Sequence, residues 1–147
     1  PRSAYLPREP ELTEAAREEM LNSALGILED TVLSELFQRG GRAEAAVIGT
    51  SARLPEGMVI NGRVDRLVVT DTHVLVIDFK TDQPAPDDVS GVAETYITQM
   101  AAYWAVLQTA YPGRQVSAAL CWTDGPKLMR LPDAVLSESL NTAFSAV

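Results

Sequence analysis

Hydrophobic and polar positions recur with two different periods along this chain, and the change of period divides it in two. From Glu11 to about Leu28 the leucines recur at helical spacing, and a second helical stretch is predicted from Thr31 to Phe37. Residues 1–10 hold three prolines and three charged side chains, which indicates a linker or the tail of an earlier element. We therefore expect residues 1–42 to form a helical part that packs on the rest of the chain.

Residues 43–147 show the shorter period of β-strands, interrupted by two helical stretches. A continuous apolar run at residues 74–77 is typical of a strand that is covered on both faces. A loop with two prolines is expected at residues 83–91. The predicted strands are 45–49, 58–69, 73–79, 116–122 and 127–131, and the predicted helices are 95–111 and 133–144. This order indicates an α/β layer structure with a mixed sheet.

Composition is that of an ordinary globular domain, with one unusual feature in its charge. The chain has 147 residues, of which 46% are hydrophobic and 22% charged, and no apolar run is long enough to span a bilayer. A single cysteine, Cys121, fits a reducing compartment, so we expect a cytoplasmic protein. The net charge of −8 is unusual for a free-standing nucleic-acid binder, which is normally basic.

Three ionisable residues in the predicted hairpin point to chemistry. Asp65 lies in one apolar run, and Asp78 and Lys80 lie two apart in the next, which places the latter two on one face of a strand. Unpaired charges are disfavoured in such a place. A Mg²⁺ ion held by both carboxylates and the carbonyl of Phe79, with Lys80 beside the attacking water, would account for all three. The alternative is a structural salt bridge between Asp78 and Lys80.

Neighbouring residues strengthen the interpretation as a phosphate-processing site. Gly62 would allow close backbone approach near Asp65, and Arg66 could reach a phosphate. On the helix beyond the loop, Gln99 and Tyr103 are four apart and share one face. Gln99 could bind a phosphate oxygen or a metal-bound water; the alternatives are a solvated glutamine and a tyrosine that only packs in the core. No usable Ser-His or Cys-His pair supports acyl transfer.

The series GRVDRL, VIDFKT and QMAAY resembles the nuclease domain of the RecB family, within the PD-(D/E)XK superfamily. More narrowly, the stretch from about Ala43 to Leu131, including AALCWTDGPKLMRLP, resembles the carboxy-terminal nuclease domain of AddA-type subunits of bacterial helicase–nucleases. The resemblance implies a restriction-endonuclease-like (PD-(D/E)XK) α/β fold, with a mixed central sheet flanked by helices.

The resemblance also implies roles for individual residues. The metal ligands would be Asp65, Asp78 and the carbonyl of Phe79, and the catalytic residues would be Asp65, Asp78, Lys80, Gln99 and Tyr103. The DNA-binding residues would be Arg66, Thr81, Gln99 and Tyr103. Glu44 falls where many relatives carry an acidic residue, although an exposed edge-strand glutamate is the simpler interpretation.

One departure concerns a histidine ligand that the family usually carries on an upstream helix. The only histidine, His73, lies in the hairpin turn and is expected to be an exposed turn residue. The chain begins with Pro1, so we expect a carboxy-terminal fragment that starts after the histidine helix, with an incomplete metal site that binds metal weakly or is inactive alone. No nucleotide-binding G-x-x-x-x-G-K-[ST] loop occurs either.

The resulting expectation is a Mg²⁺-dependent deoxyribonuclease, with Mn²⁺ or Ca²⁺ as possible substitutes. It would be the exonuclease of an ATP-dependent helicase–nuclease for double-strand break repair and recombination, with ATP used only by the full-length parent. The helicase domains of the parent and an AddB-like partner subunit would hold the DNA, which would explain the acidic charge. The alternatives are a catalytically silent scaffold of the same fold and a restriction-type endonuclease. No membrane association is expected.

Overall fold

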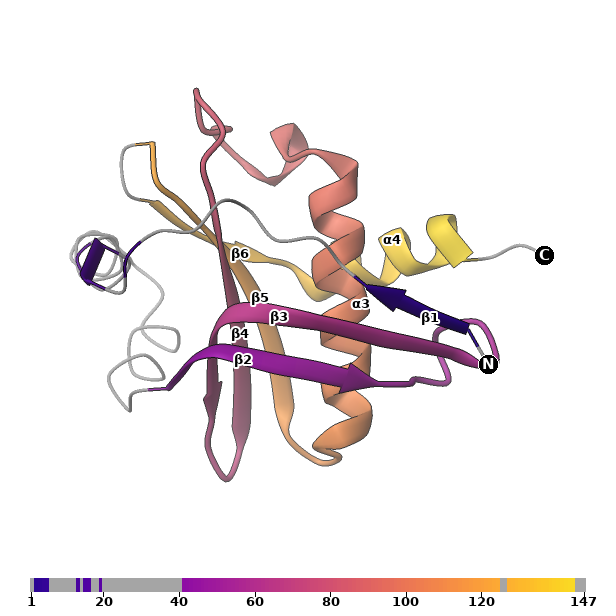
Figure 1. Ribbon diagram of the computed structural model, residues 1–147. Coiled ribbons are helices and arrows are strands. Elements are labelled where there is room, and N and C mark those ends of the chain that lie inside the picture. Colours follow the sequence, from indigo (N-terminus) through magenta and orange to yellow (C-terminus); the bar gives the residue numbers. More distant parts are fainter. Residues whose placement is uncertain are drawn as a thin grey trace.

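The computed structural model describes residues 2–5, 13, 15, 16, 19, 41–124 and 127–144 of the chain. Within this part, a six-stranded mixed sheet has the order β1-β3-β4-β5-β6, with β2 on the other edge of β3 (Figure 1). The pairs β1·β3 and β4·β5 are parallel and the remaining pairs are antiparallel. The strands are β1 (Arg2–Tyr5), β2 (Arg42–Gly49), β3 (Met58–Val69), β4 (His73–Lys80), β5 (Gln115–Trp122) and β6 (Lys127–Leu131).

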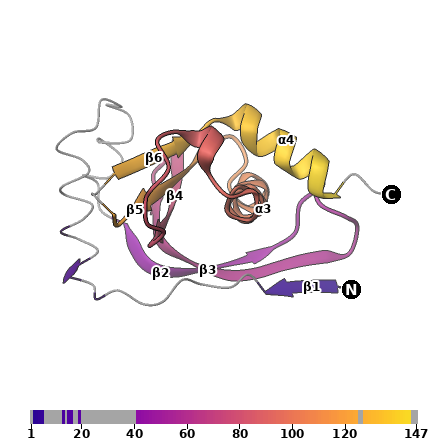
Figure 2. The same ribbon diagram turned by 90° about the horizontal axis from the view of Figure 1, so that it is seen from above.

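Two helices and one short 3₁₀ turn complete the described fold: η1 (Val89–Gly91), α3 (Glu94–Ala110) and α4 (Asp133–Phe144). Figure 2 shows α3 along its axis, inside the curve of the sheet, with α4 packed beside it. Every residue from Met100 to Leu107 is buried, as expected for a helix that is apolar on all sides and covered by other elements. The predicted mixed sheet flanked by helices is therefore confirmed.

The amino-terminal prediction needs one correction. Residues 2–5 are not a linker, because they form β1, which runs parallel to the first part of β3 from Met58 to Asn61. The prolines and charged residues of this segment did not indicate a strand, because β1 is stabilised by backbone hydrogen bonds to β3, which is distant in the sequence. The predicted helix at 31–37 and most of that at 11–28 lie outside the described residues; of the latter, Ala15, Ala16 and Glu19 are helical.

The remaining predicted elements agree with the structure to within one residue at most ends. The strand predicted at 45–49 is longer and begins at Arg42, and the predicted loop at 83–91 ends in η1. The described helices include none that is long and apolar enough to cross a membrane.

Candidate active site

The candidate site lies where β3 and β4 separate. Their backbone ladder ends at the pair Arg66 and Ile77, and one more step in the same register brings Asp65 opposite Asp78. There the carboxylates replace the missing ladder: the Asp65 N–H donates to Asp78 Oδ1 at 3.3 Å, and the Phe79 N–H donates to Asp65 Oδ2 at 2.8 Å. Because β4 continues along β5 as far as Lys80, the two aspartates occupy a fork in the sheet (Figure 1).

Lys80 lies on the same face of β4 as Asp78, as predicted from the alternation of side chains along a strand. Its Nζ lies 3.1 Å from Asp78 Oδ2 and donates to Gln99 Oε1 at 3.1 Å. Asp65, Asp78 and Lys80 expose only 7%, 5% and 2% of their surfaces. The structure therefore brings together four of the residues singled out from the sequence, from β3, β4 and α3.

The electrostatics of the fork are unbalanced. Burial, and then the hydrogen bond and negative charge of Asp65, raise the pKa of Asp78 from its ordinary 3.8 to about 7, although Lys80 acts in the opposite direction. One ammonium thus does not compensate two adjacent buried carboxylates. Further positive charge at this point would favour the ionised form of Asp78.

The donor set suits a hard divalent cation such as Mg²⁺, which prefers carboxylate and carbonyl oxygens and keeps some of its water. Asp65 and Asp78 supply two neighbouring carboxylates, each of which accepts a backbone hydrogen bond from the opposite strand. Within the part of the chain that the structure describes, no group of three His, Cys, Asp or Glu side chains is placed to hold a metal. The remaining ligands would therefore be a backbone carbonyl, water or substrate.

Tyr103 lies in the core between α3 and β3. It is fully buried, its hydroxyl donates to the Arg63 carbonyl at 3.4 Å, and a Cβ added at Gly62 would lie 2.3 Å from its oxygen. The missing side chain at Gly62 therefore leaves room for the side chain of Tyr103. This arrangement supports the core-packing alternative, in which Tyr103 holds α3 against β3.

Other predicted residues lie around the fork without joining it. Arg66 follows Asp65 in β3, so its side chain starts from the opposite face, and it is 6% exposed. Thr81 directly follows Lys80 and is partly exposed. His73 is the first residue of β4, at the end far from the fork, where its Nδ1 lies 2.8 Å from Thr72 Oγ1. It is half-buried and belongs to the strand, so the prediction of an exposed turn residue was wrong.

Glu44 has an unusual backbone for its position beside the fork. The β2–β3 register, with Ala43 opposite Arg66 and Ala45 opposite Val64, places it across from Asp65. Its φ of 51° lies in the left-handed region, which non-glycine residues seldom adopt. Its carbonyl accepts a hydrogen bond from Arg63 Nη1 at 3.1 Å.

Tyr96 contacts the site although its sequence position was not singled out. The Lys80 Nζ lies 4.3 Å from the centre of the Tyr96 ring, and the Tyr96 hydroxyl donates to Asp82 Oδ1 at 2.6 Å. The signal was available, because Tyr96 is three residues before Gln99 and therefore on the same face of α3.

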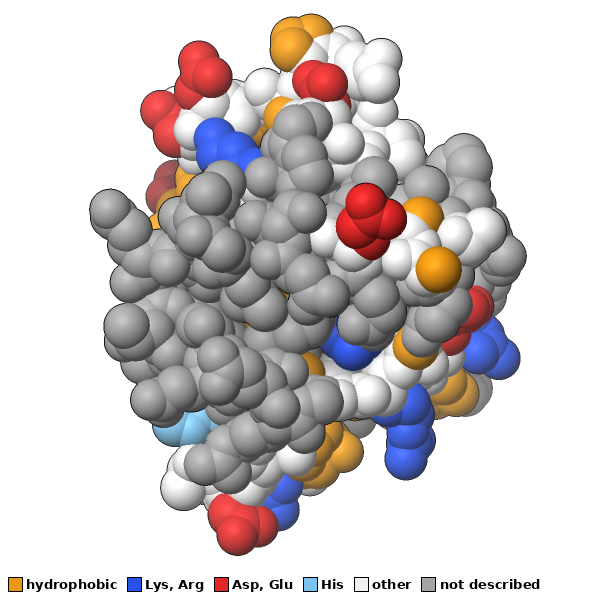
Figure 3. Space-filling view, turned by 90° about the vertical axis from the view of Figure 1, so that its left-hand side faces the viewer, with side chains coloured by type: hydrophobic (Ala, Val, Ile, Leu, Met, Phe, Trp, Pro, Cys, Tyr) orange, Lys and Arg blue, Asp and Glu red, His pale blue; other side chains and the backbone are white. Residues whose placement is uncertain are grey.

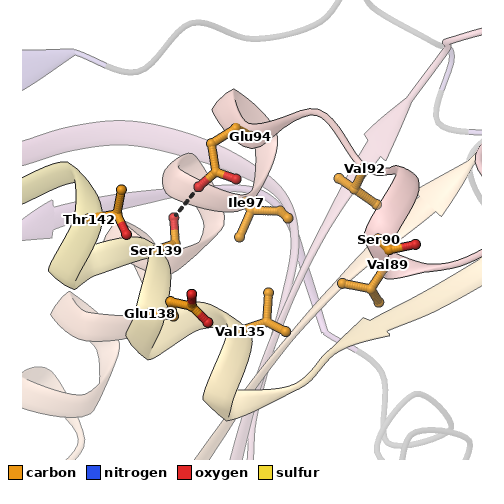
Figure 4. Close-up of a pocket in the computed structure, with 9 residues that line it drawn as sticks. All are labelled: Val89, Ser90, Val92, Glu94, Ile97, Val135, Glu138, Ser139 and Thr142. Carbon is orange, nitrogen blue, oxygen red and sulfur yellow. Dashed lines mark hydrogen bonds between the residues drawn. The ribbon is translucent and has the colours of Figure 1, made fainter.

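Cavities lie near both ends of the loop that joins β4 to α3. One of about 570 Å³ lies beside the site and is formed by the loop after Lys80 together with Trp122. The other, of about 450 Å³, lies between η1, α3 and α4 and has a mainly apolar floor (Figure 4). On its rim the Ser139 hydroxyl donates to Glu94 Oε1 at 3.4 Å. None of the fork residues lines this second cavity.

The charged side chains on one face of the molecule can be followed in Figure 3. On the face in Figure 3, the lysine and arginine side chains are scattered among acidic and apolar ones and form no continuous patch within the described residues. This distribution agrees with the net charge of −8.

Comparison with known proteins gives one informative match. Residues 2–140 match the family model described as "PD-(D/E)XK nuclease superfamily". A solved structure titled "Crystal structure of SSO0001" is similar at 16% identity and a TM-score of 0.39, covering 88% of this chain and 60% of that one. No curated protein sequence matches the chain.

Proposed function

Because the chain belongs to the PD-(D/E)XK nuclease superfamily, we propose that it is a metal-dependent DNA nuclease that hydrolyses phosphodiester bonds at the fork between β3 and β4. The observation that supports this most directly is the clustering of Asp65, Asp78 and Lys80. Lys80 Nζ is 3.1 Å from Asp78 Oδ2, and each aspartate accepts a backbone hydrogen bond from the opposite strand. Two buried carboxylates that raise one pKa to about 7 have no evident structural benefit.

Each residue of the fork has a distinct task in the proposed reaction. Asp65 and Asp78, with the carbonyl of Phe79, would hold Mg²⁺ or Mn²⁺, which supplies a nucleophilic water of lowered pKa and charge stabilisation. Lys80 donates hydrogen bonds to the phosphate as its negative charge grows in the transition state. Gln99 accepts from Lys80 and holds the ammonium in place. Asp78 has to lose its proton before it can act as a ligand.

The wider context of the proposal comes from the resemblance of the three motifs. We place the chain in an ATP-dependent, cytoplasmic helicase–nuclease of the AddA type, in which it acts as an exonuclease on strands unwound for double-strand break repair. The acidic charge supports this division of labour, because helicase domains and an AddB-like subunit would supply the grip on DNA.

The test compares two aspartates at opposite ends of one hairpin. Asp78→Ala should abolish Mg²⁺-dependent release of nucleotides from linear DNA, whereas Asp71→Asn, an exposed substitution in the β3–β4 turn, should leave it unchanged. Parallel assays with circular single-stranded DNA separate endonucleolytic from exonucleolytic action. Cleavage that persists in Asp78→Ala would refute the assignment of the site.

A catalytically silent scaffold of the same fold remains the second candidate. It is favoured by the net charge and by the absence, among the described residues, of a third acidic, histidine or cysteine ligand. Calorimetric titration with Mn²⁺ distinguishes the two. Binding that disappears in Asp78→Ala supports the nuclease, and a wild-type chain that neither binds Mn²⁺ nor cleaves DNA supports the scaffold.

A further inference from the structure

The ammonium of Lys80 is held by three groups from three directions. It can donate three hydrogen bonds. One goes to Asp78 and one to Gln99, each at 3.1 Å, and the ring of Tyr96 lies 4.3 Å away as the third neighbour. Since Lys80 is 2% exposed, these neighbours rather than solvent decide where its head group points.

The Tyr96 ring is itself fixed at two points. Its hydroxyl donates to Asp82 Oδ1 at 2.6 Å, and its ring lies 6.1 Å from that of Trp122 at an interplanar angle of 49°. Asp82 is two residues after Lys80, and Trp122 is the register partner of Lys80 in β5. The same short segment that carries the lysine therefore also anchors the ring beside it.

We propose that Tyr96 is a positioning residue for Lys80: its ring face holds the ammonium at the fork while leaving one of its hydrogens for a phosphate oxygen. The effect of Tyr96 on catalysis rests on the proposed function, whereas its effect on the position of Lys80 does not. An aromatic face attracts a cation through its quadrupole, and it does so without the negative charge of another carboxylate. A third carboxylate at this place would add negative charge to two aspartates that are already buried side by side.

The position of Lys80 can be tested without any cleavage assay, because the chain contains only two lysines, Lys80 and Lys127. Protons that lie over an aromatic ring are shifted upfield in NMR spectra. We expect one of the two lysine Hε–Cε signals to be shifted upfield, and Lys127→Arg to identify it by removing the other. The shift should persist in Tyr96→Phe and vanish in Tyr96→Leu. An unshifted Lys80 signal in the wild-type chain would overturn the inference.

The kinetic test varies the ring quadrupole at constant shape. Tyr96→Phe should keep kcat within about twofold of wild type, and 3,4,5-trifluorophenylalanine at the same position should lower kcat about tenfold, a change equivalent to about 1.4 kcal/mol. KM should change little in both, because the ring does not contact the substrate. Tyr111→Leu is the matched control, since Tyr111 lies against Arg114, at 5.1 Å, away from the fork.

The outcomes separate the inference from the proposed function. A wild-type chain that does not cleave DNA refutes both. Cleavage by the wild type with equal kcat for phenylalanine and trifluorophenylalanine refutes only the role of Tyr96, since packing alone would tolerate either ring. A graded fall in kcat, together with an upfield Lys80 signal, supports the inference.

Discussion

Replacing Asp78 by Asn should change the pH dependence of stability as well as abolish cleavage. In the metal-free protein, burial and Asp65 raise the pKa of Asp78 from 3.8 to about 7. An acid with a raised pKa binds its proton more tightly in the folded chain than in the unfolded one. Its contribution to the free energy of unfolding is therefore complete below about pH 4 and is lost as the pH rises to about 7.

The magnitude follows from the size of that rise. About three pKa units at about 1.4 kcal/mol each give an upper limit of about 4 kcal/mol for the whole loss. About two of those units lie above pH 5, so the wild type should lose about 3 kcal/mol between pH 5 and pH 8 through Asp78. Asn has nearly the same shape and does not ionise. Its one carbonyl oxygen can accept from Lys80 or from the Asp65 N–H but not from both, because these donors use different oxygens of Asp78, so the substitution also has a cost that does not depend on pH.

The assay is urea unfolding in the presence of EDTA at several pH values from 5 to 8. The stability of Asp78→Asn relative to wild type should improve by about 3 kcal/mol over this range, at an unchanged m-value. Asp71→Asn, which alters an exposed turn, should follow the wild-type curve. Parallel curves for Asp78→Asn and wild type would refute the electrostatic description of the fork.

Addition of Mg²⁺ or Mn²⁺ at pH 8 extends the same experiment. The metal should restore stability to the wild type, because it binds the ionised carboxylates of the native state. It should have little effect on Asp78→Asn. Equal stabilisation of both proteins would place the metal elsewhere.

Three further predictions concern single side chains. Gly62→Ala should lower the free energy of unfolding by about 1–3 kcal/mol, because its Cβ would lie 2.3 Å from the Tyr103 oxygen. In urea unfolding, adding Tyr103→Phe should relieve part of this loss, and strictly additive losses in the double variant would contradict the contact. Burial raises the pKa of the Cys121 thiol to about 12, so its alkylation at pH 8 should be slower by on the order of a thousandfold in the native chain than in urea, and a rapid native reaction would show an open β5. Lys80→Met should lower kcat by about 10²–10³-fold in nucleotide-release assays while Lys127→Met does not, and equal losses would argue against a specific role for Lys80.

Much of the fold was predictable because its signals are local. Two elements could be predicted without reference to the rest of the chain. The continuous apolar run, which follows a short polar turn, predicts β4, and the apolar stretch of helical length predicts α3. The common face of Asp78 and Lys80 was likewise predictable, since alternation within one strand fixes it. By contrast, β1 was missed because its pairing with β3 depends on a segment more than fifty residues away.

The composition of the site was decided partly by the sequence and partly by the tertiary structure. The sequence alone determined which residues carry charge into buried strands and that Gly62 allows a close approach. Only the folded sheet decided that β3 and β4 separate at Asp65, one residue before Arg66, so that Asp78 accepts a hydrogen bond from the Asp65 N–H and Asp65 accepts one from the Phe79 N–H. Only the packing of α3 placed Tyr96 against Lys80 and buried Tyr103. The physical reason is that periodicity fixes directions within an element, whereas register between strands and the placement of a helix on a sheet depend on contacts summed over the whole core.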